Sequence, residues 1–136
     1  MIKFTVYGEA VPKQSFRMGK FGGYQSKRVT DYANLIKITF MQQYPKHNPA
    51  IFDNSALKVV IREYRTIPSS KSKKFKMRAL VGEIRPITRP DTDNISKGIK
   101  DALNGIVYPD DKQIVTEHIE KWYSDTPRVE IEIERI

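Results

Sequence analysis

Hydrophobic and polar residues alternate near both ends of the chain. Residues 2–7 read IKFTVY and residues 128–136 read RVEIEIERI, so apolar side chains recur at every second position. A period of two places these side chains on one face of a β-strand. Two further segments, 56–64 and 113–123, are rich in β-branched and other apolar residues that favour strands. The pattern therefore predicts four strands.

Other segments have helical spacing. Residues 29–44 are predicted to form a helix, and residues 67–82 to contain a short, very basic one. Ser69 or Ser70 would cap the basic helix, and Gly82 would end it. The apolar stripe of the first helix would consist of Leu35, Ile36, Phe40 and Met41.

A third helix is predicted to begin near Asp93 and to end at Asn104–Gly105. At about 100° per residue its polar and apolar side chains separate onto opposite sides. The polar arc consists of Asp93, Asn94, Lys97 and Asp101. The apolar side, which would face the core, consists of Ile95, Ile99, Ala102 and Leu103.

The predicted order of elements is β-α-β-α-α-β-β, with a basic, glycine-rich loop or irregular hairpin over residues 8–28. No internal repeat or linker divides the chain, so residues 1–136 are expected to form a single domain. The predicted fold class is α+β, with a mixed β-sheet and helices packed mainly on one face.

The composition argues against several classes of protein. The chain has no cysteine, which excludes a disulfide framework and thiolate metal sites. It also has no apolar run near the ~18 residues that a membrane span requires. We therefore expect a cytoplasmic protein without a membrane partner.

Charge is distributed unevenly along the chain. Residues 1–89 hold 18 lysines and arginines against 5 acidic residues, whereas residues 90–136 hold 6 against 11. The basic part predicts a polyanionic partner, although a solvated basic surface is the alternative explanation. The residues proposed to contact the phosphates of such a partner are Lys13, Arg17, Lys27, Arg28, Lys71, Lys73, Lys74 and Lys76.

Residues 89–111, RPDTDNISKGIKDALNGIVYPDD, contain five aspartates. Like charges this close together are costly unless a cation compensates them. Ordinary structural roles would explain part of the stretch, since carboxylates at a helix start cap free amides. Lys97 and Asp101 would likewise suit a surface ion pair one turn apart.

The pair Asp110 and Asp111 follows soon after this helix ends, and structural roles alone do not explain it. If the chain turns back here, Asp111 returns to the neighbourhood of Asp91 and Asp93. Three converging carboxylates suit Mg²⁺, a hard ion that prefers oxygen ligands. Lys97, one turn beyond Asp93, could then orient a water molecule or stabilise a pentacovalent transition state.

This acidic stretch resembles the signature of RusA-type Holliday junction resolvases. The shared features are Pro-Asp-x-Asp-Asn after a basic residue, a lysine one turn later, an Asp-Ala-Leu helix end and an Asp-Asp pair. The segments GEAVPKQSFRM and IPSSKSKKFKMRALVG are similar to basic segments of phage-borne members. The resemblance implies a RusA-like fold over nearly the whole chain.

The resemblance also implies an activity. The chain would be a homodimeric, Mg²⁺-dependent endodeoxyribonuclease, with Mn²⁺ as a substitute and no small-molecule cofactor. It would cut four-way DNA junctions by paired symmetric nicks, in recombination, repair or phage DNA processing. A symmetric dimer supplies one site for each nick. A bacterial host, with the gene chromosomal or carried by a prophage, is implied as well.

The family's functional residues fall on matching positions of this chain. Its catalytic acids, which would also bind the metal, correspond to Asp91, Asp93 and Asp111, and its catalytic lysine to Lys97. The supporting positions are Asn94, Asp101 and Asp110.

Two other interpretations remain open. Pro90-Asp91 with Asp110-x-Lys112 fits the loose pattern of PD-(D/E)xK nucleases, in which Lys112 would replace Lys97. Alternatively, the chain is a basic nucleic-acid-binding module without catalysis. Five aspartates near the path of a phosphate backbone argue against a passive binder, because they would repel its ligand.

Overall fold

The structure is a computed structural model that describes residues 1–13, 17–19, 22–24 and 26–136. The elements in chain order are β1 (Ile2–Tyr7), β2 (Arg17–Gly19), β3 (Gly22–Tyr24), α1 (Lys27–Gln43), the 3-10 helix η1 (Pro49–Phe52), β4 (Leu57–Thr66), α2 (Lys73–Leu80), α3 (Thr92–Leu103), the 3-10 helix η2 (Asp111–Gln113), β5 (Ile114–Ser124) and β6 (Arg128–Arg135).

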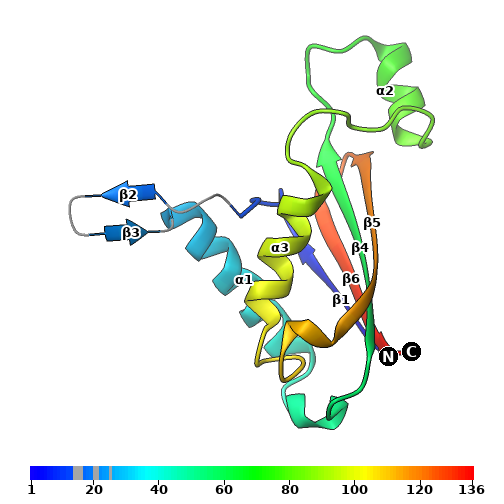
Figure 1. Ribbon diagram of the computed structural model, residues 1–136. Coiled ribbons are helices and arrows are strands. Elements are labelled where there is room, and N and C mark those ends of the chain that lie inside the picture. The colour runs from blue at the N-terminus through cyan, green and yellow to red at the C-terminus, as the bar shows by residue number, and fades with distance from the viewer. Residues whose placement is uncertain (14–16, 20–21, 25) are drawn as a thin grey trace.

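Four strands form a mixed sheet in the order β1-β6-β4-β5 (Figure 1). β6 runs antiparallel to β1 and β4, whereas β4 and β5 are parallel. Parallel neighbours need a long crossover connection, which here contains α2 and α3. The predicted α+β class, mixed sheet and element order are confirmed, and β2 and β3 add a small antiparallel hairpin within the segment predicted to be irregular.

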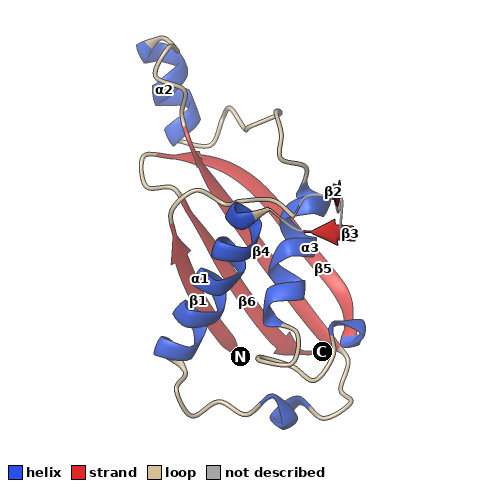
Figure 2. Ribbon diagram, turned by 90° about the vertical axis from the view of Figure 1, so that its left-hand side faces the viewer, coloured by secondary structure: helices blue, strands red, loops and turns tan. Residues whose placement is uncertain are grey.

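α1 and α3 cover one face of the sheet, and the hydrophobic core lies between the helices and the strands (Figure 2). The alternating residues of β6, Val129, Ile131 and Ile133, are buried as their pattern predicts. Phe40 of α1 packs edge-to-face on Phe4 of β1, with ring centroids 5.3 Å apart. Because α3 packs on the sheet through its apolar side, its polar side faces solvent.

The apolar stripe of α1 differs from the prediction. The buried residues are Tyr32, Ile36 and Phe40, which follow one another at intervals of four, while Leu35 and Met41 are exposed. At 3.6 residues per turn, positions four apart stay on one face, and Leu35 and Met41 are rotated away from it. The predicted stripe was therefore wrong for two of its four members.

α2 also begins later than predicted. Its N-cap is Ser72, whose hydroxyl accepts a hydrogen bond of 3.1 Å from the Phe75 amide, so the assignment of Ser69 or Ser70 was wrong. Gly82 follows the end of this helix with φ of +84°, as predicted for a residue that stops a helix. α2 stands beyond the end of the sheet in Figure 1.

The face of the sheet opposite the helices carries paired charges. Arg62 of β4 contacts Glu120 of β5 at 2.9 Å and Glu132 of β6 at 3.0 Å, and Lys3 of β1 approaches Glu132 at 3.6 Å. Opposite charges on neighbouring strands favour this register. Among the helices in the described part of the chain, none has the length and apolar character required to cross a membrane.

Candidate active site

The carboxylates of Asp91 and Asp93 lie at the start of α3. Asp91 occupies the N-cap position with an extended backbone, and its carbonyl accepts from the Ile95 amide at 3.2 Å. Within the described chain its carboxylate forms no capping hydrogen bond, and both aspartates are exposed. The helix dipole favours negative charge here. The lone pairs of both side chains are therefore available to a ligand from solvent.

Further along α3, the polar and apolar residues separate as predicted. Ile95, Ile99, Ala102 and Leu103 are buried, whereas Lys97 is exposed and Asn94 is half-buried. Asp93, Lys97 and Asp101 are four residues apart and therefore lie along one side of the helix. This arrangement presents Lys97 to solvent one turn beyond Asp93.

Asp101 pairs with a residue far away in sequence. Its carboxylate accepts from the ammonium group of Lys13, and the described residues show no Lys97–Asp101 ion pair. The backbone of Lys13 lies on the same helix, because its amide donates to the Asn94 carbonyl at 3.3 Å. Gly98 lies against this segment, since a Cβ there would lie 3.4 Å from the Lys13 amide nitrogen, at van der Waals contact. The segment before the β2–β3 hairpin is thus fastened to α3.

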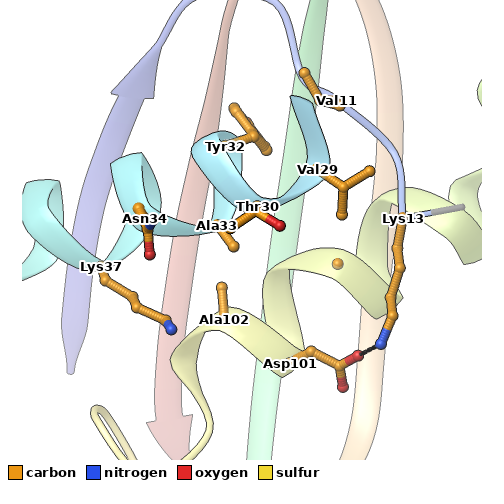
Figure 3. A pocket seen from close by; sticks show the side chains of 11 residues that line it. Val11, Lys13, Val29, Thr30, Tyr32, Ala33, Asn34, Lys37, Asp101 and Ala102 are labelled. Atoms are coloured by element: carbon orange, nitrogen blue, oxygen red, sulfur yellow. Dashed lines mark hydrogen bonds and ion pairs between the residues drawn. The ribbon is translucent and has the colours of Figure 1, made fainter. Parts of the chain in front are cut away.

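A hollow of about 200 Å³ lies between α1 and α3 beside this contact (Figure 3). Lys37 of α1 and Asp101 of α3 line it, together with Lys13. Neither Asp91 nor Asp93 contributes to its walls. This hollow is therefore separate from the start of α3.

Asp110 and Asp111 lie just after the C-terminal end of α3. The Asp111 amide donates to Oδ1 of Asn104, the C-cap of α3, at 3.0 Å. Asp110 caps η2, accepting from the Lys112 amide at 3.0 Å. Burial, and then the nearby carboxylates of Asp101 and Asp110, raise the pKa of Asp111 above its ordinary value. The negative charges of Asp101 and Asp110 thus disfavour the ionised form of Asp111.

The two acidic groups lie at opposite ends of α3. The helix has 12 residues, a length of about 18 Å at 1.5 Å per residue. The chain does turn back after α3, but it brings Asp111 to Asn104 and not to Asp91 and Asp93. Among the described residues, no three Asp, Glu, His or Cys side chains are grouped closely enough to hold a metal ion. Contrary to expectation, the carboxylates of Asp91, Asp93 and Asp111 therefore do not converge within one chain.

The donor chemistry at the start of α3 still fits a hard divalent cation. Carboxylate oxygens are the ligands that Mg²⁺ and Mn²⁺ prefer, and Mg²⁺ retains several waters beside one or two carboxylates. Asp91 and Asp93 meet that requirement, since both are exposed and Asp91 is free of a capping bond in the described structure. The inclusion of Asp111 in one ligand set stays a prediction.

The basic residues of the N-terminal region have different surroundings. Lys27 and Arg28 are exposed at the start of α1, where Lys27 pairs with Asp31 at 3.5 Å. Arg17 lies in β2, and its side chain is outside the described residues. Because the ammonium of Lys13 is engaged by Asp101, any phosphate contact it makes would compete with that pair. The DNA contacts of all four stay predictions.

Most of the lysines in and beside α2 are exposed to solvent. Lys71 lies over the Phe75 ring, with its ammonium 4.9 Å from the ring centroid. Lys71, Lys73 and Lys74 are exposed, and Lys76 is half-buried. No acidic residue occurs within the helix, so the cluster is a concentrated positive charge beyond the end of the sheet.

A buried acidic residue was missed by the sequence analysis. Glu63 of β4 is fully buried on the core face, and its Oε1 lies 2.7 Å from Nη2 of Arg65. Burial raises the pKa of Glu63, while Arg65 opposes that change. The signal was present in the strand, because Leu57, Val59 and Ile61 place Glu63 in the same inward register.

Comparison with known proteins adds two findings. A family model described as "Endodeoxyribonuclease RusA" matches residues 8–134. The chain is also 40% identical over 144 residues to "Uncharacterized protein YqaN" of Bacillus subtilis (strain 168). That alignment covers 99% of this chain and 96% of the Bacillus protein, so the similarity extends over both proteins almost completely.

Proposed function

Because this chain belongs to the RusA endodeoxyribonuclease family, we propose that it is a nuclease that resolves four-way DNA (Holliday) junctions by paired symmetric nicks. The role would lie in recombination, repair or phage DNA processing. The observation that carries the proposal is the polar side of α3. There the exposed Asp91 and Asp93 stand at the helix start, and the exposed Lys97 follows one turn later.

Asp91 and Asp93 would hold the divalent cation, Mg²⁺ or Mn²⁺, with water and substrate phosphate completing its coordination. When bound, such a cation lowers the pKa of a water molecule and offsets charge that develops on the scissile phosphate. Asp111 belongs to the ligand set that the family signature suggests. Its position at the other end of α3 makes it the least supported member of that set.

The chain's own residues would orient the substrate. Lys97 would place its ammonium beside the reacting phosphate, where a fixed positive charge stabilises the transition state more than the ground state. The free amides at the start of α3 favour an anionic phosphate in the same region. The lysines of α2 would hold the backbone of the DNA arms.

We also propose that the active form is a homodimer. The two strands to be cut in a four-way junction are related by a two-fold axis, and a symmetric dimer matches that symmetry with two equivalent sites. Cutting both strands within one complex then requires no dissociation between nicks.

The proposal is tested by cleavage of a synthetic immobile four-way junction beside a linear duplex of the same sequence, with and without Mg²⁺. Wild-type protein should give paired nicks across the junction only with the metal. Asp93→Asn should slow cleavage by about 100-fold or more while junction binding persists. Asp125→Asn, which changes an exposed aspartate between β5 and β6, should leave the rate unchanged.

Other outcomes point to the competing interpretations. Equal cutting of linear duplex would favour a general nuclease, and tight binding without cleavage under any divalent metal would favour a passive binder. Lys97→Ala and Lys112→Ala separate the two nuclease assignments. Loss of cleavage with Lys112→Ala alone would favour the PD-(D/E)xK assignment, in which Lys97 has no catalytic role.

A further inference from the structure

α2 and the residue that follows it present an exposed apolar edge, consisting of Met77, Leu80 and Val81. Their exposed fractions are 69%, 50% and 72%. Because they are three and four residues apart, the three side chains lie on one side of the helix. Large apolar side chains gathered in this way mark a surface that binds a partner more often than isolated exposed residues do.

The opposite side of α2 is anchored to the sheet. Ala79 is buried, and the Phe75 ring meets that of Tyr123 in β5 edge-to-face, with centroids 6.0 Å apart. Beyond the helix, the guanidinium of Arg85 stacks on the Trp122 ring at 3.4 Å. These contacts fix the orientation of α2 on the sheet. Its apolar edge, on the other side of the helix, therefore faces solvent.

The charges around the apolar edge indicate the chemistry of its partner. Every ionised residue within α2 is basic, and these residues are Lys73, Lys74, Lys76 and Arg78. Arg78 is the one that pairs with an acidic neighbour, Glu83, at 3.0 Å among the described residues. The partner must therefore combine negative charge with flat or flexible apolar surface. Nucleic acid meets both requirements, through its phosphates and the faces of its bases.

Helix α2 lies at the same end of the molecule as the start of α3 (Figure 1), and Asp91 and Asp93 belong to that start. The segment that joins α2 to α3 is held on β5, since Nε of Arg85 donates to the Lys121 carbonyl and Lys121 donates to the Thr88 carbonyl, each at 2.5 Å. DNA that occupies the start of α3 would therefore reach the end of the molecule that carries α2.

We propose that the apolar edge of α2 packs against base faces at the branch point of the DNA, while the lysines beside it hold the phosphates. In continuous duplex each base face is covered by its stacked neighbour. Where arms meet, base pairs lose a neighbour or open, and an apolar side chain can cover the exposed face. The edge would thus favour branched over linear DNA. This inference rests on the proposed function and names the feature of the substrate that is recognised.

The test compares the double variant Met77→Gln, Val81→Thr with the control Met41→Gln, Val115→Thr. The control changes the same residue types at exposed positions of α1 and β5. Affinities for a four-way junction and for its linear duplex are measured in EDTA, with 2-aminopurine beside the branch point. We expect about a tenfold loss of junction affinity for the α2 variant, the size of a lost apolar contact, with duplex affinity changed by less than about twofold.

The fluorescence of 2-aminopurine should rise when wild-type or control protein binds, because the base is unstacked, and should rise less with the α2 variant. Unchanged junction affinity and fluorescence in a folded α2 variant would overturn the inference. Binding of wild-type protein to vesicles of anionic phospholipid, lost in the α2 variant while junction binding is intact, would reassign the edge to a membrane surface. If wild-type protein neither prefers nor cuts junctions, the proposed function itself fails, which is a separate outcome.

Discussion

At the scale of single residues, the most consequential group outside α3 is the buried pair Glu63–Arg65. A buried charge is costly to desolvate, and only a close partner offsets that cost. Glu63 has its guanidinium partner at 2.7 Å, and Arg65 also reaches Glu9 at 3.5 Å. The end of β4 therefore depends on the pair remaining complete.

Removing one partner should be far worse than removing both. Arg65→Ala leaves the buried carboxylate of Glu63 alone and should lower the free energy of unfolding by about 3–5 kcal/mol. Glu63→Leu, Arg65→Met together should recover most of that loss, as measured by urea denaturation. The control Lys3→Ala, which removes an exposed pair, should cost less than about 1 kcal/mol. An equal loss in the single and double variants would contradict this account.

The same carboxyl predicts a dependence of stability on pH. Burial raises the pKa of Glu63 above its ordinary value of 4.5, so the folded state holds this proton more tightly than the unfolded state. The contribution of Glu63 to stability is therefore greatest below 4.5 and declines as pH rises through the folded pKa. Glu63→Gln should remove that decline, which urea denaturation of both proteins from about pH 4 to pH 7 would reveal. A constant difference between them would contradict the prediction.

At the scale of elements, the end of α2 depends on Gly82. Its φ of +84° is unfavourable for other residues, and a Cβ at this position would lie 2.9 Å from Cζ3 of Trp122. Gly82 therefore combines a helix stop with close contact to the ring on which Arg85 stacks. The orientation of the apolar edge depends on this junction.

Gly82→Ala should lower the free energy of unfolding by about 1–2 kcal/mol and change the emission of Trp122, the single tryptophan of the chain. Gly105→Ala is the matched control. Its φ is +75°, but no described atom lies within 4 Å of the added Cβ, so it carries the backbone strain without the contact. It should leave tryptophan emission unchanged. Identical emission in the two variants would show that the Gly82–Trp122 contact is unimportant.

At the scale of the whole molecule, the separation of charge along the sequence becomes a separation in space. The lysines of α2 stand beyond one end of the sheet, while Asp110 and Asp111 lie beyond the end of α3 that is remote from α2 (Figure 1). A polyanion is attracted to the first region and repelled from the second. This charge distribution would favour binding of the proposed DNA substrate at the end of the molecule that carries α2 and the start of α3.

The affinity for DNA should therefore fall steeply as the salt concentration rises. Lys73→Gln, Lys74→Gln should reduce the slope of log K against log salt by about 1.8, since each lost phosphate contact removes about 0.9 from the slope. Junction and duplex should be affected alike, in contrast to the apolar-edge variant. Lys3→Gln, Lys46→Gln removes two exposed lysines from another region and should change the slope little. Equal slopes for wild type and the α2 lysine variant would exclude these lysines from the interface.

The sequence alone determined the four strands of the main sheet, the presence of three helices and the family. Period-two alternation and helical spacing are local properties, so β6 and the buried side of α3 could be predicted from neighbouring residues. The signature on α3 is equally local, because residues four apart share one side of a helix. For that reason the exposed group of Asp93 and Lys97 was predictable, as was the end of α2 at Gly82.

The tertiary structure decided which distant groups meet. Lys13 reaches Asp101 across 88 positions, and Asn104 holds Asp111 at the far end of α3. Glu63 and Arg65 are close in the sequence, but only the packed sheet decides that their face of β4 is buried. Such contacts depend on how each turn directs the chain and on which face another element covers. Local periodicity predicts neither the direction of a turn nor the face that is covered, because it describes neighbours along the chain. Burial and ion pairing depend on neighbours in space.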